Sequence, residues 1–125
     1  MIRKLGQVML YVNDQEKAMK FWTENVGFHI IADETAGPLR WIEVAPTKDS
    51  ETTLVLHDKE VVSSMSPDLQ LGTPSLLFYS DQFEQLHNHL IAHQVTVGDI
   101  MTMPSGRTFN FADEEENYFA VMEME

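Results

Sequence analysis

A pattern near the start of the chain recurs sixty-seven residues later. Residues 7–22 read QVMLYVNDQEKAMKFW, and the later segment reads PSLLFYSDQFEQLHNHL. In each, an apolar run ends in Asn-Asp or Ser-Asp before a helical pattern, and such side chains can accept hydrogen bonds from the first free amides of a helix. The same offset places Arg40 on Arg107 and Ala45 on Ala112. We therefore predict a tandem duplication, with the function held between the two copies.

Each copy is predicted to form one strand, one helix and three further strands, from its apolar periodicity and its turn residues. The elements expected in the first copy are a strand over 5–12, a helix over 14–25, and strands over 28–32, 39–45 and 52–57. Those of the second copy are a strand over 75–79, a helix over 81–93, and strands over 96–102, 107–112 and 118–124. The modules span residues 1–57 and 74–125 of one structural domain, and the polar connector 58–73 is expected to hold a short helical turn near 60–65.

The charge and composition exclude several classes of function. A net charge of -12 argues against nucleic acid and anionic membrane surfaces as partners, because phosphate binding depends on clustered Lys and Arg. The chain has no cysteine, which excludes thiol catalysis, disulfides and thiolate metal sites. No apolar run approaches the ~20 residues that a membrane helix needs. We therefore expect a soluble, cytoplasmic protein.

Motifs of two common kinds of chemistry are missing from the sequence. There is no Gly-x-Ser-x-Gly elbow, which would expose a nucleophilic serine. There is also neither a Gly-x-Gly-x-x-Gly loop nor a Walker-type phosphate loop. Nucleophilic hydrolysis and nucleotide binding therefore have no support.

Three segments resemble the vicinal oxygen chelate superfamily, the group of glyoxalase I, bleomycin-resistance proteins and extradiol dioxygenases. VMLYVNDQEKAMKFWTENVGF is similar to the opening of that superfamily, RWIEVAP to its third strand, and GRTFNFADEEENYFAVME to its closing strand pair. The resemblance spans nearly the whole chain. It implies an α+β fold in which two tandem βαβββ modules form curved mixed sheets around a cleft, usually as a homodimer. Such a fold does not settle the chemistry.

The resemblance also implies where a metal ion would be held. Metalloenzymes of the superfamily place one His, Gln or Glu at each of four strand positions, which correspond here to Gln7, Val55, Ser75 and Val121. Only Gln7 can coordinate a metal, whereas a divalent ion needs three or more imidazole or carboxylate ligands. We therefore predict no metal and no other cofactor.

A shifted alignment leaves one alternative for a divalent metal. Neighbours two residues apart on a strand share a face, and this shift reaches His57 beyond Val55 and Glu123 beyond Val121. Gln7, His57 and Glu123 would then form a displaced set of three ligands. Otherwise, Glu123 is expected near the end of the chain in water, and His57 at the rim of a cavity.

Two polar clusters are less informative. His87, His89 and His93 lie on the second predicted helix, and the last two have the i,i+4 spacing that can share a metal. They lack the glutamate of the His-Glu-x-x-His pattern, so solvated histidines are the preferred interpretation. Residues 113–116, DEEE, are interpreted as a solvated turn.

Alternate residues of the strands are predicted to line a ligand cleft between the modules. Its predicted residues are Gln7, Met9, Tyr11, Trp41, Val55, His57, Ser75, Leu77, Tyr79, Phe119, Val121 and Glu123. Such a wall is apolar with a few hydrogen-bonding groups, which is typical of a small-molecule pocket, and methionine and aromatic rings suit a flat or irregular organic ligand. Trp41 is either core or cleft wall. Arg40 and Arg107 either anchor an anionic ligand or pair with the acidic surface, and the second is preferred.

Two functions remain open. One is a metal-free protein of the bleomycin-resistance type that binds a small, mainly apolar or aromatic molecule. The other is a metal-dependent lyase, isomerase or dioxygenase of the same superfamily with displaced ligands. The missing ligand side chains favour the first, and whether any reaction is catalysed stays open. A homodimer with two clefts is expected, because edge strands and an apolar sheet face need cover.

Overall fold

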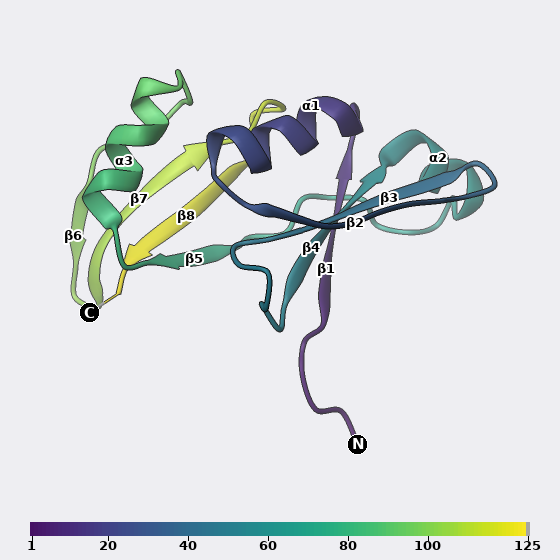
Figure 1. The fold of residues 1–125 in the computed structure, drawn as a ribbon, viewed down its shortest axis with the longest axis horizontal. Coiled ribbons are helices and arrows are strands. Elements are labelled where there is room, and N and C mark those ends of the chain that lie inside the picture. Colours follow the sequence, from purple (N-terminus) through teal and green to yellow (C-terminus); the bar gives the residue numbers. More distant parts are fainter. Residues whose placement is uncertain (125) are drawn as a thin grey trace. The chain divides into compact units, whose positions relative to one another are not determined.

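A computed structural model describes residues 1–124, and it divides the chain into two compact units with their boundary between Thr73 and Pro74. Each unit contains one four-stranded sheet, with strand orders β1-β4-β3-β2 and β5-β8-β7-β6 (Figure 1). The first unit contains β1 (Gln7–Val12), α1 (Gln15–Lys20), the π-helical turn η1 (Phe21–Asn25), β2 (His29–Ala36), β3 (Leu39–Ala45), β4 (Thr53–Asp58) and α2 (Lys59–Met65). The second contains β5 (Leu77–Ser80), α3 (Phe83–Ala92), β6 (Met101–Met103), β7 (Gly106–Ala112) and β8 (Tyr118–Glu123). The predicted α+β fold of two tandem βαβββ modules is confirmed.

In the first unit, α1 and η1 cover one face of the sheet. β1 pairs with β4 in parallel, and a parallel pair needs a long crossover connection, which begins here with α1. The Asp14 side chain caps α1 by accepting a hydrogen bond from the Lys17 amide at 3.1 Å. Gln15 Nε2 then donates to the carbonyl oxygens of Arg40 (2.8 Å) and Leu56 (3.0 Å), which ties the helix to β3 and β4. The fully buried Trp22 completes this layer.

The second unit repeats this arrangement with a more aromatic core. β5 pairs with β8 in parallel, and β7 pairs with both β8 and β6 in antiparallel fashion. The ring of Phe83, on α3, packs against Phe109 of β7 with centroids 5.1 Å apart. Leu90 on the same helix is also fully buried. The helix-covered face is therefore the core of this unit.

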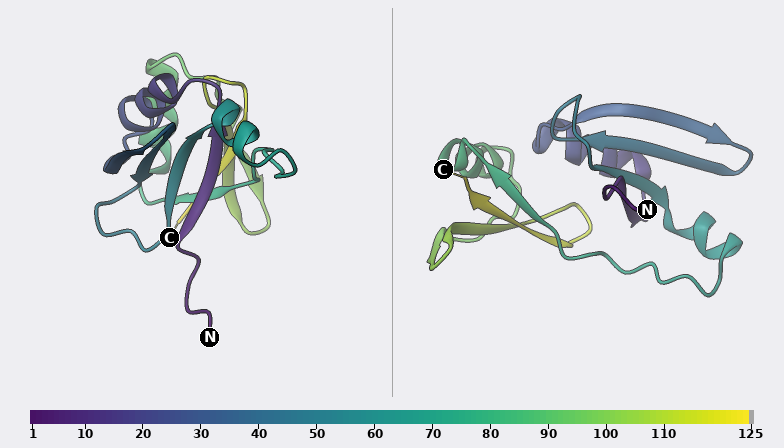
Figure 2. Two further views of the ribbon diagram at one scale, coloured as in Figure 1. Left: turned by 90° about the vertical axis from the view of Figure 1, so that its right-hand side faces the viewer. Right: turned by 90° about the horizontal axis from the view of Figure 1, so that it is seen from below.

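The predicted helical turn in the connector is present as α2. Asp58 caps it by accepting hydrogen bonds from the amides of Glu60 (3.0 Å) and Val61 (3.1 Å). After α2 the chain runs through residues 66–76 without a helix or strand before it enters β5 (Figure 2). Among the described residues, no helix is long and apolar enough to cross a membrane.

Two strands differ from their predictions by four or more residues at one end. β2 was expected to end at Ala32 but continues to Ala36, because Gly37 adopts a positive φ of 60° that lets the chain turn back at once into β3. The predicted strand over 96–102 is wrong for most of its length. Only Met101–Met103 forms β6, and the preceding residues make a single bridge, Val97 to Phe111.

Candidate functional site

The strand register of the first sheet sorts its side chains onto two faces. Ile42, Leu54 and Leu56 are buried on the face that α1 covers. The opposite face, which we call the distal face, is built from three strands in register. Its residues on β1, β3 and β4 are Gln7, Met9, Tyr11, Trp41, Glu43, Thr53, Val55 and His57. All six cleft residues predicted from this half of the chain therefore share one face.

His57 lies at the centre of one row across the distal face, between Tyr11 on β1 and Trp41 on β3. Its ring stacks on Tyr11 with centroids 5.8 Å apart, and its Nε2 lies 3.2 Å from Met9 Sδ. Nδ1 is buried and has no hydrogen-bond partner within residues 1–124. Burial lowers the pKa of His57, because the imidazolium would lose its hydration there.

Glu43 holds the second polar position on this face, beside Val55 in the register. Its Oε2 accepts a 2.6 Å hydrogen bond from Thr53 Oγ1 and a 3.5 Å hydrogen bond from Gln7 Nε2. Glu43 and Thr53 were absent from the predicted cleft. The signal was present, because each lies two residues from a predicted cleft residue, Trp41 or Val55, and alternate residues of a strand share a face.

A metal-binding cluster is not found on this face. Val55, at one of the four positions inferred from the family resemblance, offers only hydrocarbon and is 2% exposed. Gln7, at another, is hydrogen-bonded to Glu43. Within the part of the chain that the structure describes, no three His, Asp or Glu side chains are grouped so that they could hold a metal ion.

In the second unit the register separates the residues predicted to form one wall. Leu77 pairs with Ala120, so Leu77 and Tyr79 lie on the face opposite α3, and they are 46% and 64% exposed. Phe119 and Val121 lie on the α3-covered face and are buried. The prediction of a shared wall is therefore wrong for β8. The β8 residues that share a face with Leu77 and Tyr79 are Ala120 and Met122, one position away from those predicted.

Two other predicted positions in this unit also leave that wall. Ser75 is exposed and precedes β5, which begins at Leu77. Glu123 lies on the same side of β8 as Val121, two residues away, and so belongs to the α3-covered face. Its carboxylate is engaged by Arg107 of β7: Arg107 Nε donates to Oε1 at 3.0 Å and Nη2 to Oε2 at 2.6 Å.

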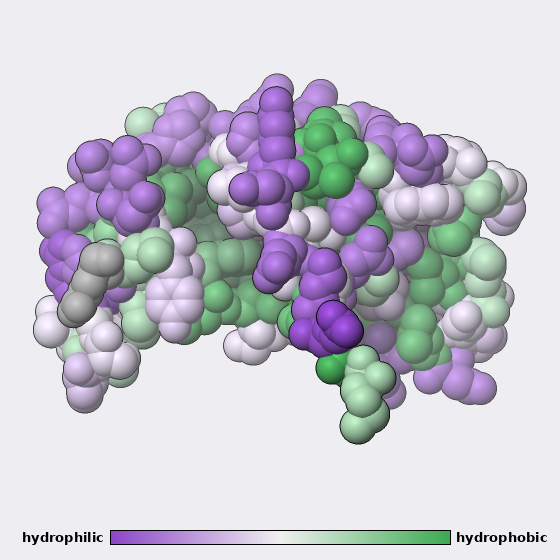
Figure 3. Space-filling model, turned by 60° about the horizontal axis from the view of Figure 1, so that its bottom comes forward, coloured by the Kyte–Doolittle hydropathy of each residue, from purple (hydrophilic) through white to green (hydrophobic). Residues whose placement is uncertain are grey.

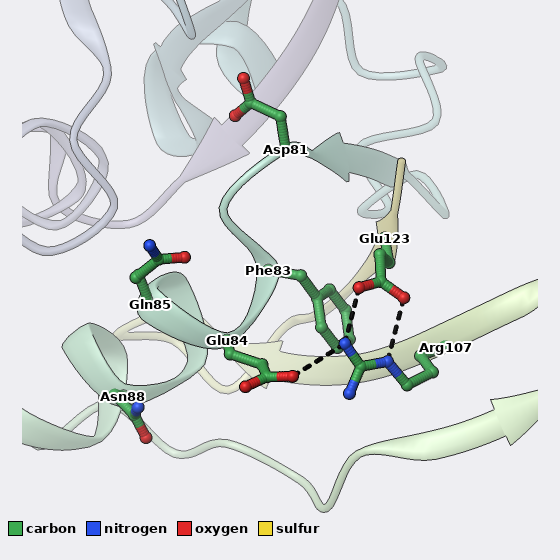
Figure 4. A pocket seen from close by; sticks show the side chains of 7 residues that line it. All are labelled: Asp81, Phe83, Glu84, Gln85, Asn88, Arg107 and Glu123. Atoms are coloured by element: carbon green, nitrogen blue, oxygen red, sulfur yellow. Dashed lines mark hydrogen bonds and ion pairs between the residues drawn. The ribbon is translucent and has the colours of Figure 1, made fainter. Parts of the chain in front are cut away.

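Arg107 and Glu123 border a hollow of about 380 Å³ in the second unit (Figure 4). Arg107 Nη2 also pairs with Glu84 Oε1 at 2.9 Å, and the guanidinium lies over the ring of Phe83, 5.2 Å from its centroid. The hydrogen bonds that Arg107 donates to Glu123 lower the pKa of Glu123, because they stabilise its charged form. The other residues that line the hollow are Asp81, Gln85 and Asn88. Among these lining residues the cation is Arg107, and it is already bound by the carboxylates of Glu84 and Glu123. These ion pairs join α3 to β7 and β8.

Arg40 makes the corresponding cluster in the first unit. Its guanidinium binds both oxygens of Asp33 at 2.9 and 2.7 Å and Glu16 Oε1 at 2.6 Å. The pKa of Asp33 is lowered, chiefly by the hydrogen bonds from Arg40. The interpretation that both arginines pair with acidic side chains is confirmed.

The histidines and the acidic turn of the second unit have local roles. His87 Nε2 lies 3.0 Å from the Gly98 carbonyl oxygen, and His93 Nδ1 donates to the His89 carbonyl oxygen at 2.9 Å. The rings of His89 and His93 are exposed, and their centroids lie 4.0 Å apart. Residues 113–116 form the predicted turn, but Asp113 is buried rather than solvated. Its Oδ1 accepts hydrogen bonds from the amides of Glu115 and Asn117.

Known proteins are similar to this chain in sequence and in fold. Residues 4–121 match the family model described as the Glyoxalase/Bleomycin resistance protein/Dioxygenase superfamily. "Uncharacterized protein YetH" of Bacillus subtilis (strain 168) is 37% identical, over 98% of this chain and 100% of its own. TnmS3, an antibiotic binding protein from Streptomyces sp. CB03234, has a similar structure, with a TM-score of 0.84 and 31% identity over 99% of this chain and 98% of its own. A superfamily member from Sphaerobacter thermophilus DSM 20745 has a TM-score of 0.82 at 25% identity, covering 98% of both chains. The protein therefore belongs to the Glyoxalase/Bleomycin resistance protein/Dioxygenase superfamily.

Proposed function

We propose that this protein binds a small, mainly apolar or aromatic molecule against the distal face of the first sheet, without a metal ion. One observation carries the proposal: the half-buried imidazole of His57, whose buried Nδ1 has no partner within residues 1–124, lies in a surface of thioether and aromatic groups. Binding pockets typically combine such apolar groups with a few polar atoms that orient the ligand. The similarity to an antibiotic binding protein supports a binding role.

The side chains at the positions inferred for metal ligands support a metal-free site. Val55 has no donor atom, and Gln7 is hydrogen-bonded to Glu43. The alternative, a metal-dependent lyase, isomerase or dioxygenase using Gln7, His57 and Glu123, has less support because Arg107 binds both oxygens of Glu123. Protein purified without a histidine tag and without chelator should carry far less than one divalent ion per chain by elemental analysis. A stoichiometric ion lost on substitution of His57 or Glu123 would restore the enzyme interpretation.

Binding can be detected through Trp41, one of the two tryptophans in the chain. Trp22 is fully buried under the other face, and Trp22→Phe leaves Trp41 as the single reporter. Apolar burial contributes roughly 25 cal/mol per Å², so a neutral aromatic compound is expected to bind and to change Trp41 emission in a saturable way. Ordering and association costs offset much of that gain, so micromolar or weaker affinity is expected.

The position of the ligand is tested by Val55→Glu, which should weaken binding because a buried carboxylate without a partner must lose its hydration or take up a proton. Val61→Glu, on α2, makes the same change elsewhere in the unit and should leave affinity unchanged. Far-ultraviolet circular dichroism establishes that both variants fold. Equal affinity in all three proteins would place the ligand away from the distal face.

We also propose that the chain forms a homodimer. Tyr79 and Tyr118 of the second unit are 64% and 61% exposed, and hydrophobic residues reach the surface in several places in the view of Figure 3. Apolar sheet surface and unpaired strand edges are commonly covered by another chain. Light scattering at micromolar concentration should give about twice the chain mass of 14.3 kDa. A mass equal to that of one chain would contradict this proposal without affecting the proposed binding site.

A further inference from the structure

We infer that the ligand of the distal face is an aromatic molecule that carries hydrogen-bond donors, with an ammonium group preferred and a carboxylate disfavoured. This inference rests on the proposed function and narrows the class of ligand. It follows from the chemistry of two polar side chains on this face, His57 and Glu43, each of which keeps an acceptor atom without a hydrogen-bond partner among the described residues.

His57 offers an acceptor rather than a donor. Its Nε2 lies 3.2 Å from the sulfur of Met9, and a thioether has no hydrogen to donate, so the ring proton belongs on Nε2. A neutral ring then has its lone pair on Nδ1, the nitrogen that is buried without a partner among the described residues. The lowered pKa of His57 agrees with a neutral ring. A ligand hydroxyl or N–H can satisfy this atom once the side chains that cover it move aside.

Glu43 offers a second acceptor, held in a defined position. Thr53 Oγ1 and Gln7 Nε2 both donate to the same oxygen, Oε2. Thr53 is itself buried, so the short bond fixes the carboxylate against the sheet. Both hydrogen bonds end on one oxygen, which leaves Oε1 available to a donor from outside the described chain. A charged donor suits it best, because hydrogen bonds between ionised groups are the stronger ones.

The charges around this face point the same way. Its strand positions on β1, β3 and β4 include no Lys or Arg, and β2 adds Ala32 and Glu34 beside Glu43 and Trp41 in the register. Arg40, the basic residue of β3, lies on the opposite face in its bonds with Glu16 and Asp33. An anionic ligand would therefore meet a carboxylate, and the strand positions of this face supply no cation to balance it. An ammonium would meet that carboxylate and the faces of aromatic rings, which attract cations.

Four naphthalenes with similar side groups test whether the unmodified protein prefers an ammonium, a hydroxyl, an apolar group or a carboxylate. They are 1-ethylnaphthalene, 1-naphthalenemethanol, 1-naphthylmethylammonium and 1-naphthoate, each measured by equilibrium dialysis near neutral pH. We expect the ammonium compound to bind about tenfold more tightly than the ethyl compound, the alcohol to lie between them, and the naphthoate to bind most weakly. This order needs no variant.

Substitutions of Glu43 and His57 show which atoms cause the preference, and a substitution of Glu24 is the control. Glu43→Gln should reduce the affinity for the ammonium compound about tenfold while changing that for 1-ethylnaphthalene less than about twofold. Glu24→Gln, on the exposed side of η1, removes the same charge on the other side of the sheet and should change neither affinity. His57→Phe keeps an aromatic ring and should remove the advantage of the alcohol over the ethyl compound.

The outcomes distinguish this inference from the proposed function. If 1-ethylnaphthalene binds as tightly as the ammonium compound and Glu43→Gln has no selective effect, the inference is overturned while the binding site stands. If Glu24→Gln weakens binding of the ammonium compound as much as Glu43→Gln does, the preference comes from the net charge of the protein and the inference also fails. If none of the four compounds binds, both the inference and the proposed function are contradicted.

Discussion

The two units keep the same arrangement on the helix-covered face of the sheet and differ on the other face. In both, an arginine at the matching position binds two carboxylates: Arg40 in the first and Arg107 in the second. On the opposite face, the first sheet carries a partly satisfied imidazole and carboxylate, whereas the second carries exposed Leu77 and Tyr79. The duplication has therefore preserved the contacts that hold helix to sheet, and the uncovered faces have diverged.

The largest effect is expected from the helix-covered face of the second unit. Phe109→Ala should lower the free energy of unfolding by about 3–5 kcal/mol, because a fully buried ring is lost and a cavity remains. Tyr79→Ala, on the other face, should cost about 1 kcal/mol or less, because that ring is already 64% exposed. Urea unfolding followed by circular dichroism measures both. Comparable losses would show that the two faces contribute equally to stability.

A smaller effect is expected from pH at the distal face of the first unit. The pKa of His57 is lowered in the folded protein. Near neutral pH the ring is therefore mainly neutral in both the folded and unfolded states, and its protonation does not reduce the free energy of unfolding. As the pH falls through about 6.5, the unfolded chain takes up a proton more readily, and the free energy of unfolding decreases. His57→Gln should therefore lose less stability than the wild type between pH 7 and pH 5, as measured by urea unfolding at both values.

The control for this experiment is His93→Gln, which removes an exposed histidine at the C-terminal cap of α3 and should leave the loss of stability caused by His57 in place. The lowered pKa values of Asp33 and Glu123 also reduce stability in acid, but only as the pH falls below about 4 and these carboxylates become protonated. The interval from pH 7 to pH 5 therefore separates the effect of His57 from that of these two carboxylates. Identical slopes for the wild type and His57→Gln would mean that the imidazole is not desolvated.

The smallest effect is expected where the two units are most alike. Arg40→Met and Arg107→Met should each lower the thermal midpoint slightly and by similar amounts, because partly exposed ion pairs contribute little in water. The loss should shrink in about 1 M NaCl, which screens such charges. Differential scanning calorimetry at low and high salt checks both variants. A large loss from one variant alone would show that the two arginines have different roles.

The sequence predicted the fold better than it predicted the site. Helix caps such as Asp14 and turn residues such as Gly37 act locally, so the order of the elements could be derived from the repeat. Alternation also grouped the distal-face residues of β1 and β4 correctly. It failed on β8, where Phe119 to Met122 are all apolar, so that no alternation of polar and apolar residues shows which face is which.

Glu43 was missed although its spacing from Trp41 placed it on the distal face, because its role depends on partners from other strands. In an alternating strand a charged residue is ordinarily assigned to solvent, and nothing local shows that Thr53 and Gln7 will donate to it. Those contacts come from β4 and β1, and they exist only once the three strands are aligned. A partner supplied by pairing across the sheet cannot be read from the spacing of residues along one strand.

The parallel pairing of β1 with β4 has a consequence for how the distal face forms and opens. Gln7 pairs with Thr53, so closing this pair orders a long stretch of chain, whereas the β2–β3 hairpin closes across a short turn at Gly37. Distant pairings are reached late in folding, because the entropy of loop closure must be lost before their contacts form. β1 is also an edge strand, held by β4 alone, and edge elements exchange their amide hydrogens by local opening. A ligand that contacts Met9 and Tyr11 together with His57 would therefore join the last-formed strand to the rest of the sheet, and its binding should appear as slower amide exchange along β1.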